Sequence, residues 1–449
     1  MSLRPSLGAC AIVLITCFAK GSLAADTNTA LPQPLNDNDF RPVNINAAKL
    51  GQQLFYDKIL SGNQNIACST CHHHDLASAD GLSLGVGEGG IGLGEQRTVG
   101  EGASKIKRRV PRNATALFNL GAHEFTHLFH DGRVSIDPIF PSGFNSPAEE
   151  FLPKGLDSIL AAQALFPMTS PVEMAGERNE NQIAGATRRR PDYVWEILER
   201  RLRNTLGYEA LFKAAYPEQI KHSSDINSVH MANALAAFIE HEWRADESPF
   251  DAYLRGDKNA LTDEQEQGMR LFYGKAQCSS CHSGALQTDH KFHAIMLPSF
   301  GPGRTRRFEH IARDRGRINE TDRLEDSYRF RTPSLRNVTA TAPYGHNGAY
   351  RTLEGIIRHH LSPLESLDNY DASQLLMPQD EYLRKTDFLI QHDKREMARL
   401  RRYRDIDLPA LNDQEIELII AFLGALTDEQ SLYGRLGAPS KVPSHIPVD

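Results

Sequence analysis

Apolar residues recur at helical spacing in several stretches of the chain, and this pattern predicts a mainly α-helical protein. In residues 225–245, for example, Val229, Ala232, Ala236 and Ile239 fall on one face of a helix. No stretch alternates apolar and polar residues strongly, so we expect no large sheet. The expected helices are residues 44–58, 191–216, 225–245, 263–274, 352–361 and 413–426.

One short helical segment occurs twice. Gly51 begins a run of eight residues, and Gly268 begins a second run that matches it at five positions: the glycine, a Leu-Phe-Tyr triplet and a final lysine. Such self-similarity predicts two copies of one structural unit. We expect an N-terminal unit over residues 26–248, a C-terminal unit over 249–433 that begins with a linker at 249–256, and a Pro/Ser-rich tail over 434–449.

Residues 81–104 interrupt the helical pattern of the N-terminal unit. They hold nine glycines, a density that predicts a mobile loop.

Composition and the N-terminus indicate an exported globular protein. Residues 1–25 resemble a signal peptide, with Arg4, an apolar run from Ala9 to Ala19 and a small-x-small cleavage site before Ala25. A short membrane anchor is the alternative, although the apolar run is shorter than a span requires. No other apolar run is long enough to span a membrane, and the net charge of −7 argues against a general nucleic-acid binder. We therefore expect the mature protein in the bacterial periplasm.

The four cysteines outside the signal peptide form two pairs, each followed by histidine. Cys68 and Cys71 precede His72, and Cys278 and Cys281 precede His282. In a C-x-x-C-H motif the two thiols can form thioethers with one haem while the histidine ligates its iron. A redox dithiol or a zinc site is the alternative, but zinc pairs usually lie within about 20 residues of each other. The motifs predict two covalently bound c-type haems.

Three further motifs accompany the haem-attachment sites in a fixed order. They are Pro111–Asn119, Asp131–Arg133, and Phe330–Val338 running into Thr341–Gly348. Over residues 44–426 the chain thus resembles the bacterial dihaem cytochrome c peroxidase family, which includes the MauG enzymes. The resemblance implies two cytochrome c-like domains, a peroxide-reacting N-terminal haem and an electron-transferring C-terminal haem. It also implies a calcium ion between them, with ligands Asn113, Thr341 and Pro343.

The resemblance assigns two catalytic residues near the N-terminal haem. Glu173, in a Val-Glu-Met context, corresponds to the general acid–base, and Gln163, ten residues earlier, corresponds to the residue that orients peroxide. The alternative is that Glu173 merely caps or solvates a helix. Some members place a distal histidine after the first haem motif, but residues 84–90 contain none, so we expect an open distal position. His123 and His127 remain alternative distal ligands, whereas His73 and His74 are expected to face solvent.

The C-terminal haem departs from the family pattern at its distal side. The family places methionine or tyrosine at the position that aligns with His360. Leu353, Ile357 and His360 share one helical face, while His359 points about 100° away. His360 as a second axial ligand to His282 predicts a bis-histidine haem of lowered potential. The alternative is a surface or core histidine. A second departure is His130, where the family often has a tryptophan relay between the haems.

Three functions remain open on the sequence alone. The first is reduction of hydrogen peroxide with electrons from a small c-type cytochrome or cupredoxin. The second is MauG-like oxidation of aromatic residues on a partner protein, and the third is a dihaem electron carrier. Two basic segments, residues 304–317 and 384–404, dock an acidic partner, pair with haem propionates, or form solvated surface. The oligomeric state stays open, a homodimer included.

Overall fold

The computed structural model describes residues 31–187, 189–305 and 312–449. The predicted signal peptide therefore lies outside the described residues. Within them the protein is predominantly helical, as predicted, and no helix is both long and apolar enough to cross a bilayer. The α-helices are α1 (Ile45–Tyr56), α2 (Cys68–Cys71), α3 (Ile159–Ala164), α4 (Gln182–Ala186), α5 (Pro191–Arg203), α6 (Tyr208–Ala215), α7 (Ser228–Glu242), α8 (Pro249–Leu254), α9 (Asp263–Tyr273), α10 (Ile318–Thr321), α11 (Leu353–Leu361), α12 (Pro363–Asp368), α13 (Glu381–Asp387), α14 (Lys394–Leu400), α15 (Asp413–Gly424) and α16 (Glu429–Tyr433).

The described residues form two small antiparallel sheets. One joins β1 (His127–Leu128), β2 (Val134–Ile136) and β3 (Phe144–Asn145), in that order. The other pairs β4 (Phe292–His293) with β5 (Phe330–Arg331). The strands are only two or three residues long, which is why no alternating pattern is visible in the sequence.

The sequence repeat is a repeat of helix packing. A Cβ added to Gly51 in α1 would lie 1.9 Å from a backbone oxygen of α7, and one added to Gly268 in α9 would lie 1.9 Å from a backbone oxygen of α15. Only glycine permits two helices to cross so closely. The phenylalanines of the repeats also correspond, since Phe55 and Phe272 each lie 5.2 Å, between ring centroids, from a phenylalanine of the partner helix.

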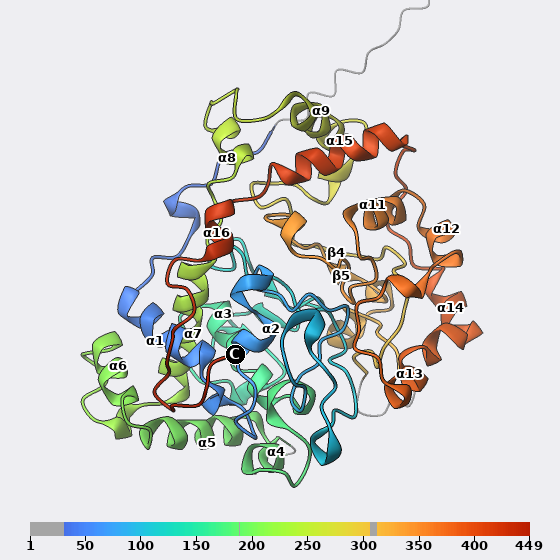
Figure 1. Ribbon diagram of the computed structural model, residues 1–449. Coiled ribbons are helices and arrows are strands. Elements are labelled where there is room, and N and C mark those ends of the chain that lie inside the picture. The colour runs from blue at the N-terminus through green and yellow to red at the C-terminus, as the bar shows by residue number, and fades with distance from the viewer. Residues whose placement is uncertain (1–30, 188, 306–311) are drawn as a thin grey trace, which may run out of the picture.

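Each helix pair has its own hydrophobic cluster. The first cluster surrounds α1 and α7 and contains both tryptophans of the chain, Trp195 and Trp243. The second surrounds α9 and α15. In Figure 1 α9 and α15 lie together at the top of the molecule, and α1 and α7 lie together at its left, beside α2.

Two predicted elements differ from the structure. The helix expected over residues 191–216 is broken into α5 and α6, because Gly207 adopts a left-handed backbone with φ +94. Residues 249–254, expected as a linker, form helix α8. Ser248 and Asp251 build a capping box there, and Pro249 takes the first helical position.

The C-terminal tail belongs to the N-terminal unit. After α16 it runs back along α1 and α7 and ends near α2 (Figure 1). The Ser444 hydroxyl donates to the Asp57 carboxylate at 2.6 Å, and Val442 is buried in the first cluster. The backbone N–H groups of Leu436 and Gly437 donate to the buried carboxylate of Glu242. Tertiary contacts, rather than local pattern, therefore order this Pro/Ser-rich segment.

The glycine-rich segment, expected to be a mobile loop, is packed against the protein over residues 82–89, while residues 101–104 are exposed. Leu84 and Val86 have no exposed surface, and Arg97 is buried. Several of its glycines sit where the backbone passes against other backbone; a Cβ on Gly87, for example, would lie 1.9 Å from the carbonyl oxygen of Val172. The glycines therefore serve close packing, which composition alone does not distinguish from flexibility.

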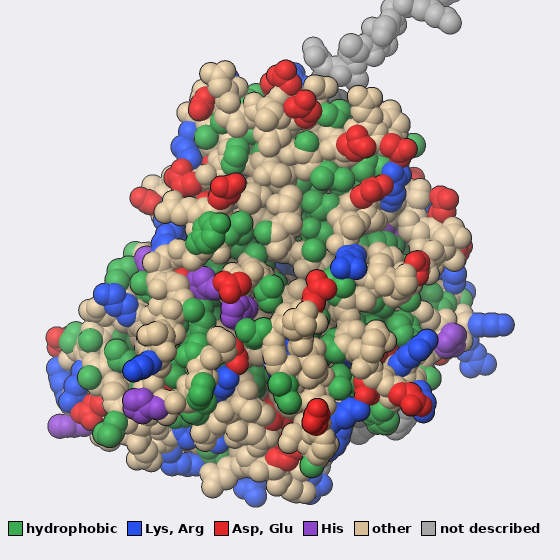
Figure 2. Space-filling model, in the orientation of Figure 1, with side chains coloured by type: hydrophobic (Ala, Val, Ile, Leu, Met, Phe, Trp, Pro, Cys, Tyr) green, Lys and Arg blue, Asp and Glu red, His purple; other side chains and the backbone are tan. Residues whose placement is uncertain are grey.

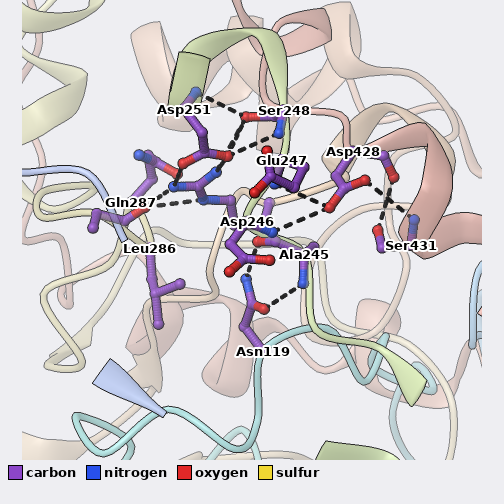
Figure 3. Close-up of polar contacts among 12 residues, drawn as sticks. Asn119, Ala245, Asp246, Glu247, Ser248, Asp251, Leu286, Gln287, Asp428 and Ser431 are labelled. Carbon is purple, nitrogen blue, oxygen red and sulfur yellow. Dashed lines mark hydrogen bonds and ion pairs between the residues drawn. The ribbon is translucent and has the colours of Figure 1, made fainter. Parts of the chain in front are cut away.

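A buried polar network joins the two units at the segment before α8 (Figure 3). Asn119 exchanges two hydrogen bonds with the backbone of Ala245, at 2.6 and 2.8 Å. Asp251 pairs with Arg336, and both side chains are fully buried. Asp428 accepts from the backbone N–H groups of residues 246 and 247. The junction is therefore built from satisfied polar groups and is not a loose connection.

Candidate functional sites

The first C-x-x-C-H motif forms α2 and the turn after it. His72 follows the helix, and its Nδ1 lies 2.9 Å from the carbonyl oxygen of Ser78. The Ser78 hydroxyl in turn accepts from the Leu117 N–H at 2.8 Å. The contact between Nδ1 of His72 and the Ser78 carbonyl oxygen orients the imidazole and leaves Nε2 as the nitrogen suited to bind iron. Cys68 and Cys71 are not joined in a disulfide.

Glu173 lies on a single turn of π-helix, Pro171–Ala175. Burial raises the pKa of its carboxyl group, and the charge of Arg133 opposes that shift. Burial, followed by the charges of Asp80 and other groups that include Glu173, raises the pKa of the Cys71 thiol to about 12. Glu173 is therefore in electrostatic range of the first haem-attachment motif. Turns of this type are frequent at functional sites.

Gln163 lies at the end of α3, in the N-terminal unit. Its Oε1 atom is buried and, among the described residues, has no hydrogen-bond partner. Such an atom is costly unless a bound group satisfies it. The unpartnered amide oxygen and the half-buried carboxyl group of Glu173 are the features expected where a small polar ligand binds.

The second motif opens onto a cavity of about 310 Å³. Both His282 and His360 line it. Nδ1 of His282 lies 3.1 Å from the carbonyl oxygen of Gln287, and Nδ1 of His360 lies 2.8 Å from that of Ile356. Burial, then the charge of His360, lowers the pKa of His282 to about 4. Both imidazoles are thus held through Nδ1 and disposed to be neutral, the form that ligates metals.

The neighbouring His359 has a different environment, as the helical spacing predicts. It is fully buried, and its two nitrogens contact the Tyr350 hydroxyl at 2.8 Å and the Ile295 carbonyl at 2.6 Å. Both hydrogen-bonding positions are therefore occupied by protein, and His359 does not line the cavity.

His73 and His74 were expected to face solvent, but both are buried. Nε2 of His74 lies 2.7 Å from a carboxylate oxygen of Glu242, and its Nδ1 contacts the Tyr56 hydroxyl. Because these partners come from α1 and α7, sequence adjacency to His72 gave no sign of the contact. His123 is exposed, and His127 packs edge-on against Phe292 at 5.7 Å between ring centroids.

The residues around the cavity of the second motif fit a haem. Apolar side chains line most of it, including Phe272, Leu353 and Leu423. Arg331 also lines it and, among the described residues, pairs with no carboxylate; its nearest acceptors are carbonyl oxygens at 3.3 and 3.5 Å. Burial lowers the pKa of Arg331 to about 10. A buried cation of this kind is matched by the propionates of a haem. Arg331 belongs to the motif Phe330–Val338, but the motif by itself does not indicate what this arginine does.

Two further histidines, His130 and His346, line the cavity of the second motif. Nε2 of His130 lies 3.2 Å from the Asn113 carbonyl oxygen. His346 stacks on Phe330, with ring centroids 3.5 Å apart and planes inclined by 8°. The two imidazole centroids are 6.5 Å apart. Aromatic groups therefore occupy this region even though no tryptophan precedes Asp131.

The predicted calcium ligands lie around the same cavity. Asn113, Thr341 and Pro343 all line it. The Asn113 amide donates to the Leu82 carbonyl at 2.8 Å, and the Thr341 hydroxyl donates to Val338. The oxygens available there are neutral, a set that a hard cation accepts.

Several arginines of the two basic segments contact acidic residues of the same chain. Arg304 pairs with the Asp131 carboxylate, and Arg317 donates to the Asp131 carbonyl oxygen. Arg313 pairs with Glu396, and Arg401 pairs with Asp368. Residues 306–311 lie outside the described part of the chain. Figure 2 shows acidic and basic side chains interspersed over the visible face. These contacts favour structural roles for the arginines named here.

Comparison with known proteins places these features in a family. A profile of the family described as Di-haem cytochrome c peroxidase matches residues 46–259. The methylamine utilization protein MauG of Methylorubrum extorquens is 27% identical over 361 residues, which cover 78% of this chain and 81% of that protein. Cytochrome c peroxidase Ccp of Escherichia coli is 29% identical over 344 residues, which cover 76% of this chain and 58% of that protein.

A solved structure agrees at the level of the fold. The crystal structure of a MauG-like protein associated with microbial copper homeostasis superposes with a TM-score of 0.57 at 24% identity. The match covers 90% of this chain and 95% of that one. Since two C-x-x-C-H motifs, the intervening motifs and these relatives agree, the chain matches the di-haem cytochrome c peroxidase family that includes MauG, and it is an oxidoreductase with two haem cofactors.

Proposed function

We propose that the protein is a periplasmic peroxidase that reduces hydrogen peroxide with electrons from a small c-type cytochrome or cupredoxin. The observation that carries the proposal is the half-buried carboxyl group of Glu173, on a π-helical turn and with a raised pKa, in electrostatic range of the first C-x-x-C-H motif. A carrier of electrons needs no such group, whereas cleavage of an O–O bond needs protons delivered at the oxygen atoms.

In this proposal the first haem is attached through Cys68 and Cys71, with His72 as its proximal ligand. The second would be attached through Cys278 and Cys281, and His282 and His360 would bind its iron. When bound, the haems supply the redox chemistry, taking up electrons from the donor and passing them to peroxide.

The residues of the chain then manage the protons. Reduction of one hydrogen peroxide takes two electrons and two protons and gives two water molecules. Glu173 accepts a proton from one peroxide oxygen and delivers it to the other, which departs as water. The remaining oxygen takes up the two electrons from the donor and two protons from solvent and becomes the second water. Gln163 hydrogen-bonds to peroxide and so orients it. The Ser78 carbonyl holds His72 in the tautomer that keeps Nε2 free.

A calcium ion on Asn113, Thr341 and Pro343 is part of the same proposal. Its neutral oxygen ligands would tie residues of the N-terminal unit to the loop before α11. A chelator that lowers peroxide turnover reversibly, with recovery on added calcium, would support it; unchanged turnover and metal content below one calcium per chain would reject it.

The proposal is tested by replacing Glu173 with glutamine. Loss of a general acid–base typically costs 10²- to 10⁴-fold in rate, so peroxide turnover should fall by about that factor while both haem spectra are retained. Glu240→Gln is a matched control, because burial also raises the pKa of Glu240, to about 7, and that residue has no assigned part in the reaction. Full turnover in Glu173→Gln would reject the assigned role.

A second candidate is MauG-like oxidation of aromatic residues on a partner protein. The specific observation is that His360 lines the same cavity as His282, since two imidazoles lower a haem potential relative to imidazole and methionine. An anaerobic hydrogen peroxide titration of the fully oxidised protein separates the two. Rapid reaction without prior reduction favours the MauG-like function, and reaction only after one electron is added favours the peroxidase.

A further inference from the structure

The π-turn that carries Glu173 is held by two segments far from it in the sequence. The Glu88 N–H donates to the Glu173 carbonyl at 2.9 Å. The Gly62 N–H donates to the Met174 carbonyl at 2.7 Å. The backbone that directly follows the Glu173 side chain is therefore held by two hydrogen bonds from outside the turn.

Each of the two segments that contact the turn is bound by an arginine, which donates hydrogen bonds to its backbone carbonyls. Arg97 donates to the carbonyl oxygens of residues 86, 87 and 92, at 2.5, 2.8 and 2.7 Å. Arg201 donates to those of residues 59, 61 and 62, at 3.0, 2.6 and 3.1 Å. Within the described chain neither guanidinium pairs with a carboxylate. A guanidinium group whose N–H groups all donate to backbone carbonyls fixes the shape of that backbone, because its planar fork fits only one arrangement of acceptors.

The packing leaves little room for the turn to move. A Cβ on Gly87 would lie 1.9 Å from the Val172 carbonyl oxygen and 2.9 Å from the Cα atom of Glu173. A Cβ on Gly62 would lie 1.9 Å from the Ala175 carbonyl oxygen. Backbone thus meets backbone on both sides of the turn.

We propose that Arg97 and Arg201 are positioning residues for Glu173. Each shapes a segment whose N–H group then locates the turn, so the carboxyl group stands where peroxide binds. The inference rests on the proposed role of Glu173. A general acid–base must lie within hydrogen-bond reach of the proton it moves, and a displacement of about 1 Å costs on the order of 10²-fold in rate.

A double-mutant cycle tests the coupling of Arg97 to Glu173. Arg97→Met should lower kcat for peroxide by about 10²-fold with KM little changed, but should add almost nothing in a Glu173→Gln background. Arg203→Met is the control, because Arg203 lies on the same helix as Arg201 and donates to Ile226 and Glu199. An equal loss in both backgrounds would overturn the inference. Full activity of Glu173→Gln would instead reject the proposed function.

The variant Arg97→Lys distinguishes the effect of the positive charge of Arg97 from the effect of its hydrogen bonds to the backbone. Lysine keeps the positive charge but cannot grip three carbonyls, so its turnover should resemble that of Arg97→Met. Wild-type turnover in Arg97→Lys would overturn the positioning role.

Two measurements keep the inference testable if Arg97→Met does not fold. Gly87→Ala drives a Cβ against the turn and should lower kcat, whereas Gly185→Ala, where an added Cβ meets nothing within 4 Å, should not. Hydrogen exchange of the holoprotein should speed up at residues 86–90 and 172–176 in Gly87→Ala and in Arg97→Met, but not in Arg203→Met. Unchanged exchange and turnover in Gly87→Ala would refute the proposal.

Discussion

Replacing Asp251 with alanine should destabilise the part of the molecule built around α9 and α15. The carboxylate of Asp251 accepts from Arg336 at 2.5 and 2.8 Å, and neither side chain has exposed surface (Figure 3). The same carboxylate accepts from the backbone N–H and hydroxyl of Ser248 and so caps α8. Its removal leaves a buried guanidinium with only a hydroxyl and a carbonyl as partners.

The magnitude follows from this environment. Breaking a buried ion pair by removing one partner costs about 3–5 kcal/mol, because the remaining charge is uncompensated. Loss of a helix cap costs ~1 kcal/mol, but one carboxylate serves both roles, so the two do not add in full. We expect a loss of about 4 kcal/mol. Replacing both partners, as in Asp251→Leu with Arg336→Met, should recover part of it, since no buried charge then remains.

Urea unfolding of the holoprotein measures this loss. Both tryptophans, Trp195 and Trp243, belong to the first hydrophobic cluster, whereas α8 packs into the second. Far-UV circular dichroism reports on both clusters, and tryptophan fluorescence reports on the first. The dichroism midpoint of Asp251→Ala should therefore fall further than the fluorescence midpoint.

A small effect would refute the reasoning. A loss below ~1 kcal/mol would mean that the buried pair contributes no more than an exposed one. Glu209→Ala provides the comparison, because Glu209 pairs with Lys213 at 2.6 Å on the surface of α6 and its removal should change the midpoint little. Equal shifts in the two variants would show that burial of the Asp251 pair has no energetic consequence.

Three further outcomes are expected. His360→Ala should remove the six-coordinate low-spin absorption of the second haem, and an unaltered spectrum would reject His360 as a ligand. Gly434→Ala should lower the urea midpoint more than Gly437→Ala: φ is +68 and +66, but only at Gly434 would the Cβ meet a buried carboxylate oxygen, at 2.1 Å; equal losses would mean that backbone strain alone matters. Stability should fall as pH drops below about 4. Burial raises the pKa of Asp131, but the neighbouring arginines, Arg112 first, outweigh burial and hold that pKa well below its ordinary 3.8. The unfolded carboxylate then takes up a proton before the folded one, and Asp131→Asn should flatten this acid limb in urea titrations; an unchanged limb would assign it to other groups.

Local signals predicted where several helices begin. Helices α9 and α15 start at residues 263 and 413, as expected, and Thr262 and Asn412 cap them, because a cap depends on residues only a few positions apart. The same signals were present at Ser248 and Asp251, where a helix was not expected. A proline in that segment suggested a linker, although proline is favoured at a first helical position.

Signals that depend on context misled in characteristic ways. The glycines at 81–104 indicated mobility, yet Gly87, Gly89 and Gly100 mark places where backbone meets backbone. His74 stood beside a proposed ligand and was taken as a surface residue, yet α1 and α7 supply its hydrogen-bond partners. Neither outcome is encoded in a short window, because each depends on which distant segment lies opposite.

By itself the sequence determined the chemistry and the repetition of this protein. Two C-x-x-C-H motifs and a repeated Gly-x-x-Leu-Phe-Tyr segment are local patterns, and they predicted two haem sites and two similar helix units. The tertiary structure alone decided what surrounds Glu173 and where the tail after α16 lies. Glu88 and Gly62 contact the Glu173 turn, and Arg97 and Arg201 contact the segments that carry them, only after chain segments far apart in the sequence have packed together. Such contacts depend on the closure of long loops, and no local periodicity records them.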